Sequence, residues 1–237
     1  MPTRVRIVGP GRAGGSFERA LASAGWSVTT TRRGEPLADA AAGVDLVLVC
    51  VPDRDVAQVV AAITPDPSTV VAHCAGSLGL DVLASHTTVG SVHPLVALPS
   101  PDLGAAALVG AWFGVAGDPL VRRVVDALDG QAVAVDDAHR TVYHAAAVVA
   151  SNHLVALMGQ VERIAADAGV PLEAYLELAR GSLRNVADLG PTAALTGPVS
   201  RGDWDTVRRH LRALPPEERP AYRALADEAA RLAAERQ

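Results

Sequence analysis

Three glycines near the start of the chain have a spacing that suits the binding of phosphate groups. The motif Gly9-x-Gly11-x-x-Gly14 follows a short β-branched run at residues 5–8 and precedes an apolar helical pattern. In this order Gly9 permits a tight turn, Gly11 lets the backbone approach a pyrophosphate, and Gly14 lets the helix pack close to the strand. The first turn of the helix offers unpaired N–H groups, and its dipole favours negative charge. An ordinary glycine turn is the alternative. The spacing predicts a dinucleotide site at Gly9, Gly11, Arg12, Ala13 and Gly14.

The second predicted strand, residues 26–31, ends in Thr31-Arg32-Arg33 and carries no acid at that point. An Asp or Glu there would accept a hydrogen bond from the ribose of NAD, whereas Arg suits the 2′-phosphate of NADP. Two guanidinium groups and a hydroxyl bind phosphate well because the guanidinium bonds in a planar, bidentate way. Glu35 comes too late to serve the ribose. We therefore expect NADP(H) in preference to NAD(H), with a merely solvated turn as the alternative.

Predicted strands and helices alternate up to about residue 135, which indicates an α/β fold with a doubly wound parallel sheet. Residues 45–51 form a continuous apolar run, typical of a strand covered on both faces. The run ends at Val51-Pro52-Asp53, where we expect Val51 and Pro52 to line the cofactor and Asp53 to lie beside it or to cap a helix. The remaining strands are predicted at residues 5–8, 26–31, 68–73, 88–92, 112–115 and 131–135.

After residue 135 the pattern is helical only, so we predict a dinucleotide-binding domain at residues 1–135 and a helical domain at residues 136–237. Its helices are expected at residues 136–168, 172–189, 203–214 and 216–237. The first would be about 50 Å long at ~1.5 Å per residue. A small domain cannot bury such a helix. We therefore expect part of it to pack on a second copy, which gives a homodimer through the helical domain.

Composition narrows the class of protein further. The chain has 237 residues, is 49% hydrophobic and carries a net charge of −5 without a Lys/Arg block, which argues against a nucleic-acid partner. We see no apolar run as long as the ~18 residues of a membrane span, and the apolar start is too short for a signal peptide. Two cysteines are too few for a disulfide framework or a zinc site. A cytoplasmic protein without a metal, acting on a small molecule, is expected.

Several segments together resemble one family. They are Gly9–Gly14, Val51-Pro52-Asp53, residues 73–77 and 91–95, and in the helical half residues 143–146, 150–152 and 194–203. With these motifs the chain resembles oxidoreductases in which a Rossmann-like domain is joined to a DUF2520 domain. They are relatives of 6-phosphogluconate dehydrogenase, ketopantoate reductase and pyrroline-5-carboxylate reductase. The resemblance covers nearly the whole chain. It implies an NAD(P)-dependent enzyme and adds Ala75, within residues 73–77, to the cofactor site.

His93 is the first candidate for chemistry. Reduction by a nicotinamide cofactor needs a group that stabilises charge on the acceptor and supplies a proton. His93 directly follows the fifth predicted strand, and ligands of doubly wound sheets bind at the carboxyl ends of strands. The usual pKa of histidine suits proton transfer near neutral pH. The alternative is a histidine that fixes a loop by bonding a backbone carbonyl.

On the long helix Arg140, His144 and Ser151 share one face, with Asn152 about a quarter-turn aside. Related hydroxyacid dehydrogenases carry a catalytic Lys and, four residues later, an Asn at a similar place. Arg keeps its proton, since its pKa stays above ~12. Arg140 and Ser151 are therefore predicted to bind substrate, with His144 as the acid. Asn152 is predicted to bond the substrate or the nicotinamide amide, with a structural helix–helix bond as the alternative.

A polar turn at residues 196–203 precedes a helix for which Asp203 or Ser200 is the expected N-cap. We predict that Arg201 in this turn closes over an anionic substrate. The leading hypothesis is NADPH-dependent reduction of a small anionic 2-oxo acid, with ketopantoate as the best single guess. The alternatives are reduction of a cyclic imine, a prephenate-type oxidation, and a non-catalytic sensor or scaffold that binds NADP.

Overall fold

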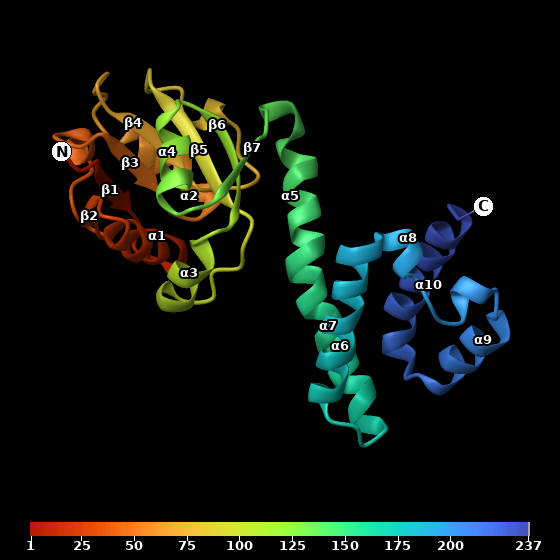
Figure 1. The fold of residues 1–237 in the computed structure, drawn as a ribbon. Helices are drawn as coiled ribbons and strands as arrows, with labels where there is room; N and C mark the ends of the chain where they lie inside the picture. Colours follow the sequence, from red (N-terminus) through yellow and green to blue (C-terminus); the bar gives the residue numbers. More distant parts are fainter. Residues whose placement is uncertain (237) are drawn as a thin grey trace. The chain divides into compact units, whose positions relative to one another are not determined.

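A computed structural model describes residues 1–236 of the chain as two compact units. The first unit spans residues 1–152 and the second begins at His153. The first unit is a seven-stranded sheet with helices on both faces, and the second is entirely helical (Figure 1). The α/β class and the helical second half, both predicted from the sequence, are confirmed.

The strands lie in the order β2-β1-β3-β4-β5-β6-β7. Neighbours are parallel except β5 and β6, so the predicted doubly wound parallel sheet is confirmed, with one antiparallel pair that was not predicted. Strand direction does not change the apolar pattern of a buried strand, which is why the sequence did not reveal it. The strands are β1 (Arg4–Val8), β2 (Ser27–Thr31), β3 (Leu46–Val49), β4 (Val70–His73), β5 (Val89–Pro94), β6 (Trp112–Gly117) and β7 (Gln131–Ala134).

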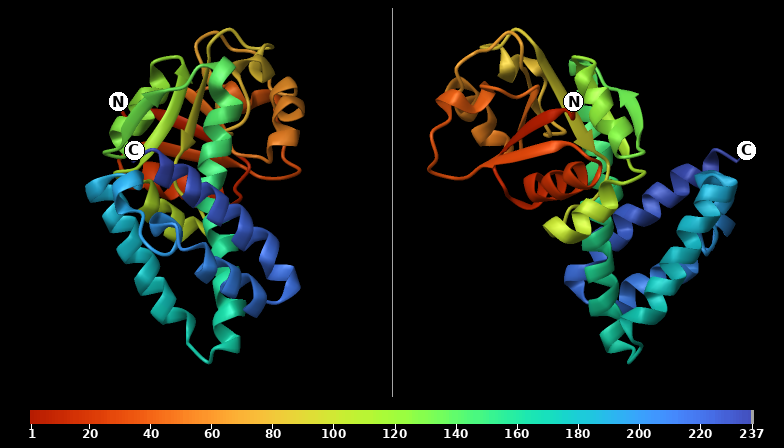
Figure 2. Two further views of the ribbon diagram at one scale, coloured as in Figure 1. Left: turned by 90° about the vertical axis from the view of Figure 1, so that its right-hand side faces the viewer. Right: turned by 60° about the vertical axis from the view of Figure 1, so that its left-hand side comes forward.

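Two apolar layers sandwich the sheet, and β3 contributes to both. Leu46 and Leu48 belong to one core cluster, while Val47 and Val49 belong to the other. Because side chains alternate between the faces of a strand, a strand buried on both faces must be apolar throughout. One layer includes α1 (Arg12–Ser23), α3 (Pro101–Leu108) and α4 (Leu120–Ala127), and the other α2 (Asp53–Ala61), η1 (Ala38–Ala41) and η2 (Leu80–Leu83). Figure 2 shows α1 and α3 side by side.

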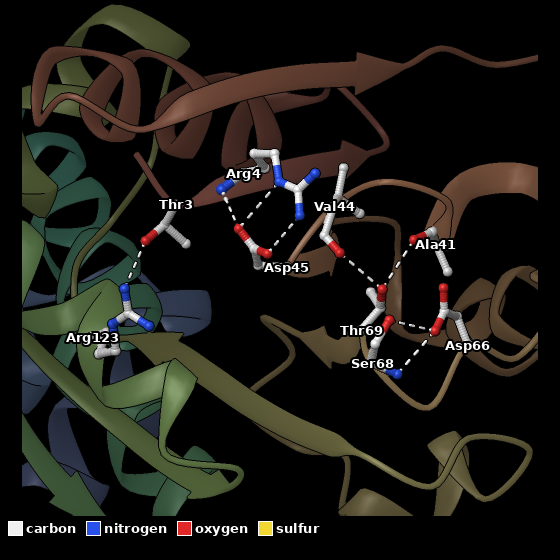
Figure 3. Close-up of polar contacts among 9 residues, drawn as sticks. All are labelled: Thr3, Arg4, Ala41, Val44, Asp45, Asp66, Ser68, Thr69 and Arg123. Atoms are coloured by element: carbon white, nitrogen blue, oxygen red, sulfur yellow. Dashed lines mark hydrogen bonds and ion pairs between the residues drawn. The ribbon is translucent and has the colours of Figure 1, made fainter. Parts of the chain in front are cut away.

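Polar contacts at the amino ends of the strands fix the register of the sheet (Figure 3). The Arg4 backbone N–H and side chain donate to the Asp45 carboxylate, which joins the start of β1 to the start of β3. The buried Thr69 hydroxyl lies within hydrogen-bond distance of two backbone carbonyl oxygens before β3. Arg123 on α4 donates to Thr3 at 2.8 Å. These ties leave the opposite, carboxyl edge of the sheet free for a site.

The first unit continues past the predicted boundary at residue 135. It includes η3 (Asp137–His139) and α5 (Arg140–Val148), because side chains of α5 bond to residues of β5. A π-helical segment, Val149–His153, follows directly. The predicted helix 136–168 is thus a 3₁₀ turn, α5, this π segment and α6 (Leu154–Asp167) in succession.

In the second unit α6 is followed by α7 (Leu172–Leu189), α8 (Pro191–Ala194), η5 (Val199–Arg201), α9 (Trp204–Ala213), η6 (Pro216–Glu218) and α10 (Arg219–Ala234). A buried polar contact ties α6 to the start of α10. Gln160 donates to the Glu218 carbonyl at 2.9 Å, and Arg163 pairs with the Glu218 carboxylate. By contrast, none of the eighteen residues of α7 is buried. Figure 2 shows α6 and α7 diverging from the turn that joins them.

The helical stretch Asp137–Asp167 is long and apolar enough to cross a membrane by length and composition. Its most apolar window has a mean hydropathy of 1.3, and none of that window is buried. The expectation that no segment reaches this length is therefore wrong. Length and composition do not distinguish a membrane span from a helix that packs on another protein surface.

Candidate functional site

A cavity of about 720 Å³ opens at the carboxyl ends of β1, β2 and β3. Strand β1 lies between β2 and β3, so the chain continues to one side of β1 and then to the other. Doubly wound sheets bind ligands at such a switch point. Seven of the residues predicted to hold the cofactor line this cavity. They are Gly9, Gly11, Thr31, Arg32, Arg33, Val51 and Pro52.

The three glycines differ in what surrounds them. Gly9 has φ +94° and packs against Val51 and the Cys50 carbonyl, and a Cβ on Gly14 would overlap the Gly9 carbonyl oxygen. These two glycines let the loop close on the protein itself. At Gly11, by contrast, no protein atom lies within 4 Å of the position that a Cβ would occupy. The open side of the loop is therefore at Gly11, where a pyrophosphate needs to approach the backbone.

Helix α1 begins at Arg12, so the N–H groups of Arg12, Ala13 and Gly14 belong to its first turn and have no partner within the helix. No acidic residue lies in this turn and no side chain caps it. Backbone donors and the helix dipole are thus available to a bound anion. The residues fit the phosphates of a dinucleotide.

At the end of β2 the guanidinium-bearing residues Arg32 and Arg33 are exposed and line the cavity. Glu35, which the sequence placed too late for the ribose, lines it too, but its carboxylate accepts a hydrogen bond from the Arg32 backbone N–H at 2.7 Å. Glu35 therefore closes the turn that presents the two arginines. The lining also includes residues that the sequence did not single out, among them Leu37, Arg54 and Gln58.

A polar cluster lies beside this cavity, on strands β4 and β5 and on α5. In the sheet His73 pairs with Ser91, and His93 pairs with Gly114. Ser91 and His93 project to the same face because side chains two residues apart in a strand do so. Positions 140, 143 and 144 of α5 also share one face, since they are three and four residues apart. The cluster consists of His73, Ser91, His93, Arg140, Tyr143 and His144.

His93 Nδ1 and the Tyr143 hydroxyl oxygen are 2.8 Å apart. Burial, helped by the nearby His144 and Arg140, lowers the pKa of His93 from 6.5 to about 4. Burial also raises the pKa of Tyr143. His93 is therefore neutral at neutral pH, and in the tautomer that carries its proton on Nε2 the Tyr143 hydroxyl donates to Nδ1. Bonding of a backbone carbonyl by Nδ1 of His93, the alternative considered from the sequence, is not what the structure shows.

His144 is half-buried and stands edge-on to His93, with ring centroids 5.9 Å apart. Both rings rest against Gly76 in the loop after β4. A Cβ on Gly76 would lie 2.7 Å from His93 Nε2 and 2.7 Å from His144 Cδ2. Only a residue without a side chain allows this packing. The structure thus brings the two predicted catalytic histidines together.

Arg140 lies underneath the cluster and is 1% exposed. Its guanidinium donates to the buried Ser91 hydroxyl, and its Nε is 3.7 Å from the Asp137 carboxylate. Nε and Nη1 have no hydrogen-bond partner among the described residues. The substrate-binding role predicted for Arg140 stays a prediction, because its side chain is buried while Nε and Nη1 are unpaired among the described residues. Burial lowers the pKa of both His73 and His93, and the positive charge of Arg140 lowers both further.

The loop after β4 connects the cluster to the cavity. His73, fully buried, accepts from the Ala75 N–H with Nδ1 and bonds the Gly79 carbonyl through Nε2. Ser77 donates to the Asp53 carboxylate at 2.6 Å, and Asp53 directly follows Pro52 of the cavity wall. Asp53 begins α2 but does not cap it. Ala75 and Asp53 thus lie between the cofactor cavity and the histidines.

Other predicted site residues are not brought to this cluster by the contacts of the described chain. Ser151 and Asn152 are exposed in the π segment, where the Ser151 hydroxyl lies within hydrogen-bond distance of the Ala147 carbonyl oxygen and of Asn152 Oδ1. The π turn also interrupts the 3.6-residue periodicity that predicted one shared face. Arg201 is exposed in η5 of the second unit. The substrate roles of these three residues stay predictions. Asp203 caps α9 through the Thr206 N–H, as expected.

Tyr143 is the functional residue that sequence reasoning missed. It belongs to the segment that carried the family resemblance, and it lies three residues after Arg140 and one before His144. The spacing alone could have placed it on the same face. Its partner His93 comes from a strand fifty residues earlier, and this pairing became visible only in the structure.

Two family models match separate parts of the chain. Residues 31–99 match a Rossmann-like domain, and residues 112–229 match the domain of unknown function DUF2520. The first match begins at the end of β2, so the glycine loop is assigned from its own geometry. None of the curated proteins matches the sequence.

Solved structures share the fold over nearly the whole chain. A protein from Bacteroides fragilis described as a candidate NADP oxidoreductase is 20% identical, with a TM-score of 0.83 over 97% of this chain and 98% of that one. A protein from Thermotoga maritima is 24% identical, with a TM-score of 0.75 over 98% and 100%. A reductive aminase from Aspergillus terreus, solved with NADPH and ethyl levulinate, is 17% identical, with a TM-score of 0.69 over 98% and 94%. At these identities the likeness shows the fold. Together with the two domain matches, it shows that the chain belongs to the family in which a Rossmann-like domain is joined to a DUF2520 domain.

Proposed function

We propose that the protein is an NADPH-dependent reductase of a small C=O or C=N compound. One observation carries the proposal: the cavity beside the glycine loop and the His–Tyr–His cluster lie at one edge of the sheet. The hydrogen bond from Ser77 to Asp53 links the loop after β4 to the residue that follows Pro52 of the cavity wall. The solved reductive aminase with NADPH, which has the same fold, supports this class of reaction. A cavity without such a cluster would suit the sensor alternative better.

The cofactor would be held by three parts of the first unit. The α1 N-terminus and Gly11 would hold the pyrophosphate, Val51 and Pro52 would line one wall, and Arg32 and Arg33 would bind the 2′-phosphate. The proposed preference for NADP(H) over NAD(H) rests on the two arginines and on Glu35, whose carboxylate is engaged by the Arg32 backbone. When bound, NADPH supplies a hydride to the substrate.

The residues of the cluster would supply and orient the proton. Because its pKa is about 4, His93 is neutral at pH 7 and cannot serve as a cationic acid. Its Nε2–H can instead donate a hydrogen bond to the acceptor atom of the substrate. We assign proton donation to His144, which is half-buried beside His93, and assign Tyr143 to hold the His93 ring in its tautomer.

The charge below the cluster favours an anionic substrate. Arg140 is always protonated. Its only close carboxylate among the described residues is Asp137, at 3.7 Å. This positive field attracts a small 2-oxo acid more than a neutral ketone of the same size, even though the buried guanidinium does not touch solvent. Ketopantoate, the compound favoured from the sequence, is the first 2-oxo acid to test.

A cyclic or acyclic imine is the second candidate, because the structural neighbour solved with a named substrate class is a reductive aminase. The test is oxidation of NADPH, followed at 340 nm, with ketopantoate, other 2-oxo acids, a cyclic imine and a ketone–amine pair. Turnover of 2-oxo acids that exceeds that of imines supports the first candidate, and the reverse order supports the second. An enzyme that binds NADPH and turns over none of these compounds would contradict both.

We also propose that the second unit builds a homodimer. The eighteen residues of α7 include no buried residue, and Leu178, Leu183 and Leu189 are each more than half exposed. An amphipathic helix with an uncovered apolar face needs a partner surface. A second copy of the same chain supplies a matching one by two-fold symmetry. Light scattering is expected to give a dimer, and to give a monomer for Leu183→Glu. A wild-type monomer at micromolar concentration would contradict the dimer.

The cytoplasmic location and the absence of a nucleic-acid partner stay predictions.

A further inference from the structure

The only two cysteines of the chain are neighbours at the carboxyl edge of the sheet. Cys50 directly follows β3 and Cys74 directly follows β4. The last ladder pair of these parallel strands is Val49 with His73, and the Cys74 N–H still donates to the Val49 carbonyl. Cys50 and Cys74 are therefore the next pair in register. Adjacent strands lie about 4.8 Å apart, which is within the ~4.4–6.8 Å between the Cα atoms of a disulfide.

Both side chains lie on the same face of the sheet. Cys50 belongs to the core cluster of α1, α3 and α4, and Cys74 packs against that same cluster. A hydrogen bond with the Cys74 thiol and burial raise the pKa of Cys50. The two thiols are free, and they are neighbours in register on one face of the sheet. The more exposed Cys74 is the thiol that an oxidant reaches first, because oxidation follows thiolate character and access.

Cys50 is also part of the cofactor cavity. Cys50 is one of the residues that line that cavity. Its N–H donates to the Val8 carbonyl at 2.8 Å, and its carbonyl oxygen lies against Gly9. The glycine loop therefore rests on the residue that would have to move when a disulfide closes. Disulfide formation brings the two sulfur atoms to a distance of about 2.05 Å.

From this geometry we infer that Cys50 and Cys74 form a redox-sensitive dithiol whose disulfide and bound NADPH exclude one another. This inference rests on the proposed cofactor site. With hydrogen peroxide as oxidant, Cys74 first becomes a sulfenic acid and one water is released. The Cys50 thiol then displaces the sulfenic oxygen as a second water, and the S–S bond forms. Peroxide gains two electrons, and the two thiols lose two electrons and two protons. A thiol reductant reverses the change.

The experiment uses the full chain, reduced and then treated with hydrogen peroxide with and without NADP⁺. Free thiols are alkylated with iodoacetamide, and the intact mass and linked peptides are measured. We expect loss of both thiols, a peptide joining Cys50 to Cys74, and slower reaction when NADP⁺ is bound. Fluorescence titration should show NADPH binding about tenfold weaker after oxidation, the effect of one lost hydrogen bond to a charged group. Dithiothreitol should restore the affinity.

Two variants control the result. In Cys50→Ser, Cys74 should stop at the sulfenic acid and be trapped by dimedone. In Cys74→Ser, the NADPH affinity should be the same before and after peroxide, which excludes damage elsewhere. Two thiols that survive peroxide, or a disulfide between chains, would overturn the dithiol. A disulfide that leaves NADPH binding unchanged would overturn the exclusion. Failure of the reduced protein to bind NADPH would overturn the cofactor site and the exclusion, while the mass measurement would still decide the disulfide.

Discussion

The cofactor cavity and the polar cluster lie at the same edge of one sheet but are built in different ways. The cavity depends on backbone: two glycines that permit close packing, one that leaves space, and the free N–H groups of α1. The cluster depends on side chains that β4, β5 and α5 bring together. A site made of backbone tolerates few side chains at fixed positions, whereas a site made of side chains depends on tertiary pairing. The two regions should therefore respond differently to mutation.

The largest effect is expected at Gly14, where the close packing of the glycine loop can be tested by adding a single methyl group. In Gly14→Ala the new Cβ would overlap the Gly9 carbonyl oxygen, so β1 and α1 would have to separate. We expect a loss of about 4 kcal/mol in the free energy of unfolding, the range of severe overpacking. Gly11→Ala is the matched control, because no protein atom lies within 4 Å of its Cβ. It should fold normally and bind NADPH more weakly. Equal stability losses in the two variants would contradict the division of roles.

The second effect concerns the cluster and its dependence on pH. The folded protein lowers the pKa of His93 from 6.5 to about 4. As the pH falls, His93 therefore takes up a proton in the unfolded chain before it does so in the folded protein. The contribution of neutral His93 to the free energy of unfolding is complete above pH 6.5 and is lost between pH 6.5 and about 4. Over this range of pH the free energy of unfolding should fall by an amount on the order of 3 kcal/mol, which follows from the difference between the two pKa values of His93.

Urea unfolding at pH values between 7 and 4.5 measures this loss. His93→Gln should remove most of the slope, and His73, whose pKa burial also lowers, should account for the remainder. The carboxylates whose pKa values are lowered, such as Asp45, act at lower pH and do not fill this window. A wild-type protein equally stable at pH 7 and pH 4.5 would show that His93 is not held neutral by its surroundings.

The smallest effect separates the two ends of the cofactor cavity. Arg32→Ser with Arg33→Ser removes both guanidinium groups at the end of β2 and leaves the glycine loop intact. We expect the affinity for NADPH relative to NADH to fall about tenfold, since a hydrogen bond to a charged group is worth about 1.5–3 kcal/mol. Arg122→Ser, at an exposed position of α4 that does not line the cavity, serves as the control. If the ratio of the affinities for NADPH and NADH did not change, the two arginines would belong to a solvated turn and would not bind the 2′-phosphate.

The same contrast explains what the sequence could predict. Gly9, Gly14 and the apolar run of β3 follow local rules, so the loop, the strands and the double layer were all predictable. The Asp203 cap was predictable for the same reason. Arg140, in contrast, looks like an exposed substrate ligand on a helical wheel, and only the packing of α5 on β5 buries it against Ser91.

Three further differences have a non-local origin. The antiparallel β6 keeps the apolar pattern of a parallel strand, so its direction is set by the path of the chain and not by its residues. The π segment Val149–His153 disturbs the phase of an otherwise regular helix and moves Ser151 out of the predicted face. The His93–Tyr143 pair joins residues far apart in the chain, which no spacing rule connects.

The most direct test of the proposed reductase compares binding with turnover in three variants. For the best substrate of the panel, NADPH affinity and kcat are measured in His144→Asn, Tyr143→Phe and wild type. The account predicts that NADPH binds all three with the same affinity. Loss of a general acid should lower kcat about 100-fold or more in His144→Asn, and Tyr143→Phe should show a smaller loss with a shifted pH profile. Wild-type kcat in His144→Asn, with its NADPH affinity unchanged, would contradict the assignment of the cluster as the catalytic site.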